Sequence, residues 1–191
     1  MILPIVAYGS PVLRKVCRDI SDSHPGLVEL IDNMWETLYN SNGVGLAAPQ
    51  VNHDIRLFLV DSAQIFANRE DGDEEYPDAP GYKGVFINAR MLSETGSPWK
   101  YEEGCLSIPR VREDVSRLDR ITISYLDEQL QPCEKEFFGI TARIIQHEYD
   151  HIEGKLFIDR IQPLKRTLLK RKLDDISKGK VKVDYRMSFP K

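Results

Sequence analysis

Two histidines four residues apart, with a glutamate directly after the first, form the pattern in this chain most suited to chemistry. These residues are His147, Glu148 and His151. Because an α-helix turns about 100° per residue, the spacing predicts both imidazoles on one helix face with the carboxylate beside them. One divalent metal can bind both rings there, while Glu148 handles the proton of a metal-bound water. The pattern indicates a metal-dependent hydrolase.

A metal held by two imidazoles needs a third protein ligand if one position stays open for water. The usual downstream ligands of such motifs are missing, because no glutamate follows Glu153 and no histidine follows His151. Asp159, Asp174 and Asp175 remain formally possible. The last two fall in a charged helix, where we expect ion pairing instead.

A thiolate ligand is available upstream in Cys105, within the run Tyr-Glu-Glu-Gly-Cys-Leu-Ser-Ile-Pro. Gly104 allows an unusual backbone angle there, and we expect Pro109 to limit the extended segment. Thiolates bind zinc, ferrous iron, cobalt and nickel well. The alternative for a lone cysteine is a small buried hydrophobic residue, which is the expectation for Cys17 and Cys133.

A third segment, Gly43–Gln50, combines glycines with a terminal glutamine. The glycines suggest a tight turn, and a phosphate-binding loop is not expected because no lysine followed by serine or threonine completes it. The side-chain amide of Gln50 can donate to a developing oxyanion. Taken alone, the segment fits an ordinary turn better.

Together the three segments closely resemble, in the same order, the signature motifs of the peptide deformylases. That family removes the formyl group from the initiating methionine of new bacterial or organellar proteins, which releases formate. The motifs are residues 43–50, 103–109 and 146–151. The resemblance implies that Cys105, His147 and His151 hold one metal ion, typically Fe²⁺, with Ni²⁺, Co²⁺ or Zn²⁺ able to replace it.

The resemblance also implies roles for the residues around the metal. Glu148 would take a proton from the bound water, which attacks the formyl carbon, and pass it to the departing amine. The side-chain amide of Gln50 and the backbone N–H of Leu106 would stabilise the oxyanion, and the backbone around Gly45 would align the peptide. Glu103 would hold the geometry of the site through hydrogen bonds. The substrate-binding residues that the resemblance implies are Gly43, Val44, Gly45, Glu103, Gly104, Arg143 and Ile144.

Arg143 departs from the family pattern. It lies four residues before His147, where family members often place an apolar residue that lines the methionine pocket. The shape of that pocket is therefore open from the sequence, although Ile140 and Ile144 can supply apolar surface.

The surrounding sequence predicts the elements that would position these residues. Apolar residues at three- and four-residue steps predict an amphipathic helix over 25–40, and short apolar runs predict strands at 55–60 and 85–88. Strict alternation predicts a strand at 121–125 that returns as an antiparallel hairpin over 133–138.

The histidine motif is predicted to lie on a helix that Thr141 caps and Gly154 ends. Isoleucines surround the histidines, so this helix should run through the core. A last helix is expected over 163–177. The predicted fold is α+β: antiparallel β-sheets packed around a central metal-binding helix, with an N-terminal amphipathic helix and a C-terminal helix.

The length of 191 residues, of which 41% are hydrophobic, predicts one catalytic domain over 1–191 with a single core. It would carry an acidic loop insert near 61–82 and a basic helix and tail near 163–191. Three cysteines without a close pair argue for a reducing compartment. Since neither a secretion signal nor an apolar run of membrane-spanning length is evident, we expect a cytoplasmic protein that does not contact membranes.

The formal charge of −4 gives no overall bias toward nucleic acid, and no sequence-specific binding to it is expected. Residues 160–191 nevertheless carry eleven Lys or Arg against three Asp. A solvated helix is the simpler interpretation. The corresponding helix of some bacterial deformylases docks on the ribosome, so a transient ribosome contact is also an expectation.

Two other functions fit the histidine motif. A zinc peptidase would cleave an internal peptide bond and would use a ligand other than Cys105. A non-catalytic, ribosome-associated module would use the metal only for structure, but structural zinc sites normally close all four positions with protein ligands. Only three good ligands are present here, which favours an open catalytic position.

Overall fold

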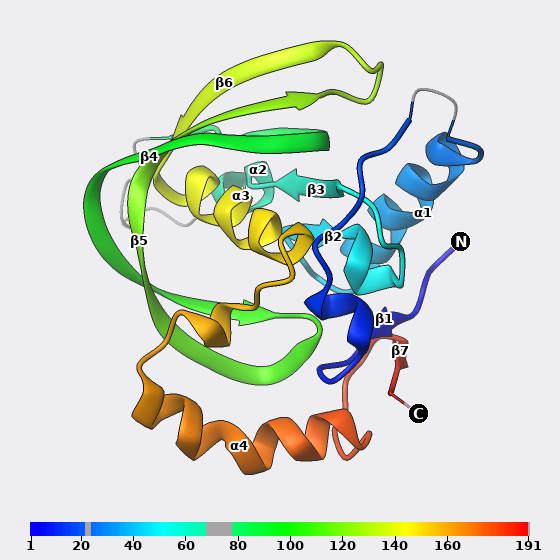
Figure 1. Cartoon of the computed structure of the whole chain (residues 1–191), viewed down its shortest axis with the longest axis vertical. Coiled ribbons are helices and arrows are strands. Elements are labelled where there is room, and N and C mark those ends of the chain that lie inside the picture. Colours follow the sequence, from blue (N-terminus) through cyan, green and yellow to red (C-terminus); the bar gives the residue numbers. More distant parts are fainter. Residues whose placement is uncertain (22–23, 68–77, 191) are drawn as a thin grey trace.

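The structure is a computed structural model that describes residues 1–21, 24–67 and 78–190, and it has the predicted α+β fold. A five-stranded antiparallel sheet curves around a central helix, α3 (Gly139–Ile152), as Figure 1 shows. The strand order across the sheet is β2–β3–β4–β5–β6. The bounds of these strands are Gly45–Ala47, Leu57–Asp61, Lys83–Cys105, Ile108–Leu126 and Pro132–Phe138.

The central helix α3 is enclosed because apolar residues cover more than one of its faces. Eleven of its 14 residues are buried. Ile144 and Ile145 belong to the same core cluster as Phe58 of β3 and Phe86 of β4. A helix held on several sides is a rigid support for ligating side chains, as the sequence predicts.

The two ends of α3 are fixed by different means. Gly154 adopts a left-handed φ of +69°, which confirms it as the terminator. The predicted N-cap Thr141 is wrong, because the helix begins two residues earlier and its N-cap residue Phe138 makes no side-chain cap bond. Instead, the carboxylate of Asp78 accepts hydrogen bonds from the N–H groups of Ile140 and Thr141 at 3.4 and 2.7 Å. Such a cap stabilises a helix by about 1 kcal/mol.

The strands β4 and β5 are much longer than the short runs predicted at 85–88 and 121–125. Four register shifts interrupt their pairing. Irregularities of this kind bend and twist a strand pair, so the long hairpin can wrap around α3. The predicted runs, 85–88 and 121–125, cover only the part of each strand in which apolar residues follow a regular pattern.

The tip of the β4–β5 hairpin carries one of the expected metal ligands. Cys105 pairs with Ile108, so Leu106 and Ser107 form a two-residue tip. Gly104 lies within β4 and does not have a left-handed φ. The unusual backbone angle that a glycine allows is therefore not adopted at Gly104.

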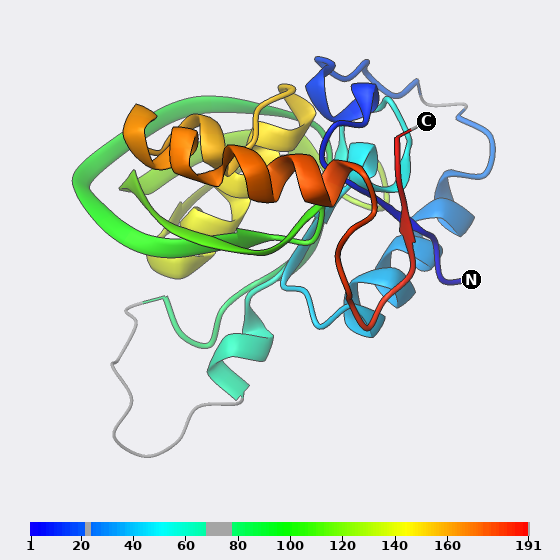
Figure 2. The same cartoon turned by 90° about the horizontal axis from the view of Figure 1, so that it is seen from below.

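The other two predicted helices and the predicted antiparallel hairpin are confirmed. Helix α1 (Leu27–Asn40) packs on β2 and β3, and α4 (Pro163–Ser177) crosses one side of the molecule in Figure 2. Strands β5 and β6 pair as the expected antiparallel hairpin. Among the described residues, no helix is both long and apolar enough to cross a membrane.

A second, two-stranded sheet is not predicted by the sequence. Strand β1 (Ile5–Val6) pairs in parallel with β7 (Met187–Ser188), in addition to the predicted antiparallel sheet. The two terminal segments consequently lie side by side (Figure 2). The shorter helices are η1 (Pro11–Arg14), η2 (Ala48–Val51), α2 (Ala63–Ala67) and η3 (Phe157–Asp159).

The acidic insert predicted at 61–82 is described only at its two ends, because residues 68–77 lie outside the described residues. Asp61 is buried and accepts a hydrogen bond from the Tyr39 hydroxyl at 2.8 Å. Asp78 caps α3. Both acidic residues thus support the fold.

Candidate metal centre and active site

The three expected metal ligands come together from two elements that are distant in the sequence. Cys105 lies at the end of β4, and His147 and His151 lie one turn apart on α3. One ligating atom from each residue lies within 4.8 Å of the others, and the Cys105 Sγ is 3.2 Å from the His151 Nε2. One thiolate and two imidazoles form a donor set that suits divalent iron, nickel, cobalt or zinc.

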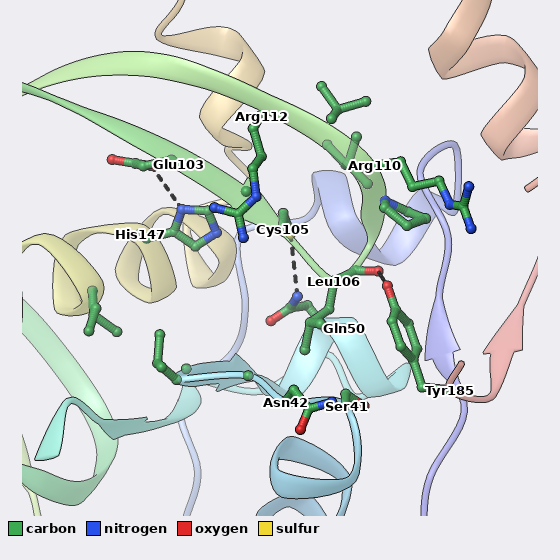
Figure 3. Close-up of a pocket in the computed structure, with 18 of the residues that line it drawn as sticks. Ser41, Asn42, Gln50, Glu103, Cys105, Leu106, Arg110, Arg112, His147 and Tyr185 are labelled. Atoms are coloured by element: carbon green, nitrogen blue, oxygen red, sulfur yellow. Dashed lines mark hydrogen bonds and ion pairs between the residues drawn. The ribbon is translucent and has the colours of Figure 1, made fainter. Parts of the chain in front are cut away.

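The orientation of the His147 ring is set by Glu103. The His147 Nδ1 donates a hydrogen bond to the Glu103 Oε2 at 2.9 Å, as Figure 3 shows. With its proton on Nδ1, the ring presents the lone pair of Nε2 as a ligand. Glu103 therefore fixes the tautomer that a metal requires.

Glu103 is in turn held by a buried network of charged groups that sequence analysis missed. Arg117 of β5 donates from Nε and Nη2 to the two Glu103 oxygens at 2.7 and 2.9 Å, and from Nη1 to Asp150 at 2.7 Å. Arg160 donates two further hydrogen bonds to Asp150. Glu103, Arg117 and Asp150 are each at most 5% exposed, so solvent cannot compensate for a lost partner.

The network keeps Glu103 ionised despite its burial. Burial alone would raise the pKa of this carboxyl, but the hydrogen bonds from Arg117 and His147 hold the pKa well below its ordinary value. A charged Glu103 is a strong acceptor for the His147 N–H.

The charged guanidinium of Arg143 points into this network. Its guanidinium donates to Glu103 at 2.9 Å and to the backbone carbonyls of Val115 and Trp99, each at 2.8 Å. It also lies over the Trp99 ring, 4.4 Å from the centroid. The positive charge of Arg143 is therefore paired with the carboxylate of Glu103 inside the protein. A direct contact of Arg143 with substrate stays a prediction.

The Cys105 thiol is in a site that favours its thiolate form. Burial raises its pKa, but the electrostatic attraction of His151 and polar contacts with both imidazoles outweigh that effect and lower the pKa to about 5. The thiolate is the form that binds metals.

Glu148 lies buried beside the ligand cluster with unused hydrogen-bonding capacity. Its side chain is enclosed, and the Oε2 atom has no hydrogen-bond partner among the described residues. Burial raises the pKa of Glu148 to about 7, against the opposing effect of His147 and His151. A carboxyl with a free oxygen and a pKa near neutrality can both accept and release a proton.

Gly45 lies so close to Glu148 that a side chain is excluded there. A Cβ atom at Gly45 would be 2.4 Å from the Glu148 Oε1 and 2.8 Å from its Cδ. At Gly43 a Cβ atom would be 2.7 Å from the Leu38 Cδ1 and 3.1 Å from the Leu106 Cδ1. Both glycines permit close approach of the backbone, which is a physical reason for their presence in the motif.

The side-chain amide of Gln50 has a fixed direction. Its Oε1 accepts the Ala47 N–H at 2.8 Å, so its Nε2 points the other way, toward the Cys105 Sγ at 3.5 Å and the Ser107 Oγ at 3.4 Å (Figure 3). The segment Gly43–Gln50 is therefore more than the tight turn suggested by its glycines: it contains β2 and most of η2.

A cavity of about 540 Å³ opens beside the ligand cluster. Apolar side chains cover part of its wall, namely Val44, Ile65, Tyr101, Ile140 and Ile144. Twelve of the predicted site residues also line it: Gly43, Val44, Gly45, Gln50, Glu103, Gly104, Cys105, Leu106, Arg143, Ile144, His147 and Glu148. The C-terminal residues 182–185 line it as well, which sequence analysis missed.

Other candidates from the sequence lie outside the centre. Asp159 pairs with Arg14 and Arg166 instead of approaching the histidines. Cys17 is buried, and Cys133 is half-buried against the core. Both cysteines thus occupy the packing positions expected of them.

Comparison with known proteins agrees with the geometry. Residues 2–167 match the family model described as polypeptide deformylase. A peptide deformylase of Christiangramia forsetii is 54% identical over 191 residues, covering 100% of this chain and 97% of that protein. A peptide deformylase of Flavobacterium psychrophilum is 55% identical and covers 99% and 97%, respectively.

Solved structures of deformylases share the fold. The crystal structure of a peptide deformylase from Legionella pneumophila superposes with a TM-score of 0.78 at 34% identity, covering 94% of this chain and 98% of that one. The crystal structure of the peptide deformylase from Thermotoga maritima superposes with a TM-score of 0.72 at 35% identity, covering 85% of this chain and 99% of that one. The chain therefore belongs to the polypeptide deformylase family, whose metal-dependent hydrolases remove the N-terminal formyl group from formyl-methionyl peptides.

Proposed function

We propose that Cys105, His147 and His151 hold the catalytic metal and that Glu148 moves the proton during hydrolysis of the formyl amide. The observation that carries this proposal is the convergence of these three residues beside a buried Glu148 oxygen that has no hydrogen-bond partner in the described part of the chain. When bound, the metal supplies a Lewis acid that polarises the formyl carbonyl and lowers the pKa of water. The residues of the chain then have to orient the substrate and transfer the proton.

Glu148 serves as general base and then as general acid. It takes a proton from the attacking water and delivers that proton to the amine that leaves as the C–N bond breaks. Its Oε1 lies beside Gly45, where the absence of a side chain leaves room for the carboxylate. The products are formate and a free N-terminal methionine.

Gln50 and Leu106 stabilise the negative charge that develops on the formyl oxygen. The Gln50 Nε2 is held toward Cys105 by the anchored Oε1, and the N–H of Leu106 follows Cys105 at the hairpin tip. Donors that are already oriented need no reorganisation during the reaction, so they stabilise the transition state more than free donors do.

The substrate backbone is proposed to lie along β2. The Asp61 N–H donates to the Val44 carbonyl, and hydrogen-bonded pairs alternate in an antiparallel ladder, so the N–H and C=O of Gly45 point away from β3. Strand β2 is at the end of the sheet order, which leaves that side available to an extended peptide. Val44, Ile140 and Ile144 would then surround the methionine side chain.

The native metal is proposed to be Fe²⁺. We expect protein purified without oxygen to contain iron and to release formate from a short formyl-methionyl peptide. An acetyl-methionyl peptide is the matched control. The iron form should lose activity in air through oxidation of the metal or of Cys105, whereas nickel or zinc forms should not. If no metal supports formate release, the proposal is wrong.

The two alternative functions are not favoured. The deformylase match covers the whole ligand set, and a peptidase would have to replace Cys105 as ligand. A purely structural metal would leave the cavity and the free oxygen of Glu148 unexplained. We propose that residues 1–191 act as one catalytic domain in the cytoplasm on formyl-methionyl nascent chains.

A transient contact with the ribosome is proposed for α4, whose side chains Lys170 and Arg171 are exposed and basic. We expect the protein to sediment with ribosomes at low salt and to dissociate as salt rises, because phosphate contacts release counterions. Charge reversal by Lys170→Glu with Arg171→Glu should abolish this association. Lys155→Glu, outside α4, should not. Absence of sedimentation at low salt contradicts the proposal.

A further inference from the structure

The segment that follows α4, residues 178–190 (the C-terminal strap), runs back across the molecule. It lies beyond residues 2–167, which match the family model. Strand β7 fixes its end against β1: the Ile5 N–H donates to the Arg186 carbonyl at 2.9 Å, and the Ala7 N–H to the Ser188 carbonyl at 2.8 Å (Figure 2). The strap is thus a fixed part of the structure.

The strap reaches the hairpin tip that follows Cys105. The Tyr185 hydroxyl donates a hydrogen bond to the Leu106 carbonyl at 2.8 Å, as Figure 3 shows. The Tyr185 ring is partly buried against the cluster of α1, β2 and β3, which limits its freedom to move. A phenol is neutral at pH 7 and therefore remains a donor.

Further contacts hold the tip from the same side. The Ser107 carbonyl accepts the Tyr8 N–H at 2.8 Å, so both carbonyls of the tip have external partners. Arg110, three residues after Ser107, adopts a left-handed φ of 61° and donates from Nε to the Lys182 carbonyl at 2.8 Å. The side chain of Lys172 donates to the Arg110 carbonyl.

We propose that Tyr185 is a positioning residue that aligns the oxyanion donor: by holding the Leu106 carbonyl, the C-terminal strap sets the direction of the adjacent Leu106 N–H. This inference rests on the role proposed above for that N–H. The tip has only two residues, so rotation of the Leu106–Ser107 peptide alters the preceding peptide too. Catalytic geometry is sensitive to such shifts, since a displacement of about 1 Å can cost about 100-fold in rate.

Tyr185→Phe removes only the hydroxyl and keeps the ring in place. We expect kcat to fall about tenfold, less than the 10²- to 10³-fold typical when a donor is removed, because the Leu106 N–H is misaligned and not lost. KM, metal content and melting temperature should stay unchanged. Tyr125→Phe is the matched control: it removes a hydroxyl that contacts the Tyr82 hydroxyl at 2.8 Å, away from the cavity, and should leave kcat unchanged.

The remaining outcomes overturn the inference in distinguishable ways. If Gln50→Ala lowers kcat but Tyr185→Phe does not, the positioning role is wrong while the oxyanion site stands. If neither variant lowers kcat in metal-loaded protein, the oxyanion assignment itself fails. If Tyr185→Phe instead raises KM for longer formyl peptides and leaves kcat unchanged, the strap binds the peptide and does not align the donor. A loss of kcat that only parallels lost metal or a lowered melting temperature also contradicts the inference.

Discussion

Glu148→Ala is expected to keep the metal and to lose nearly all turnover, with kcat lower by about 10³- to 10⁴-fold. The metal should stay because its three proposed ligands, Cys105, His147 and His151, are untouched and Glu103 still orients the His147 ring. Turnover should fail because, among the described residues that line the cavity, Glu148 is the buried carboxylate with an oxygen free of hydrogen bonds. Metal content by elemental analysis and formate release by a coupled assay measure the two effects separately.

Glu148→Gln is the matched variant for this experiment. It keeps the size and shape of the side chain beside Gly45 but cannot carry the proton. We expect it to be as inactive as the alanine variant, with the same metal content. A metal-loaded glutamine variant that retains a tenth or more of the activity would mean that the proton moves through another group and that the role of Glu148 is misassigned.

Cys105→Ala is expected to weaken metal binding by more than about 100-fold and to remove activity at ordinary metal concentrations, since even loss of a group that only orients a ligand costs 10- to 100-fold. The Cys105 Sγ lies 3.2 Å from the His151 Nε2, and among the described residues no carboxylate belongs to the group of ligating atoms that lie within 4.8 Å of one another. Competition with a chelator measures the affinity directly.

Cys133→Ala provides the control, because Cys133 is half-buried in the β5–β6 region and does not belong to the ligand cluster. It should keep both metal and activity. If Cys105→Ala kept its full metal content, the third ligand would have to be a different residue. The peptidase alternative, which needs such a ligand, would then be favoured over the assignment made here.

Some parts of the fold follow from short stretches of sequence. Helix α4 begins at Pro163 and ends at Ser177 as predicted, and α1 and the β5–β6 hairpin also match their patterns. In each case residues within a few positions of one another determine the element, because helix and strand periodicities are local. Such patterns can be recognised without knowledge of the surrounding structure.

Other parts depend on contacts between distant segments. The full lengths of β4 and β5 arise from wrapping around α3, and the cap on α3 comes from Asp78, more than sixty residues away. The expected cap from Thr141 failed because the sequence suggests only local partners. Nothing in the spacing of residues indicates which carboxylate a distant helix end will meet.

The sequence by itself determined which reactive groups this protein carries: Cys105, the two histidines with the glutamate between them, and the Gly43–Gln50 segment, which together resemble the deformylase motifs. Side-chain chemistry and spacing along one helix are local properties, so they can be read without coordinates. Tertiary structure alone decided how that chemistry is held. Arg117 of β5 holds Glu103 and is itself paired with Asp150 of α3, and Tyr185 reaches Leu106 from near the C-terminal end of the described chain. Those contacts arise from folding, which brings together groups whose separation in sequence carries no information about their separation in space.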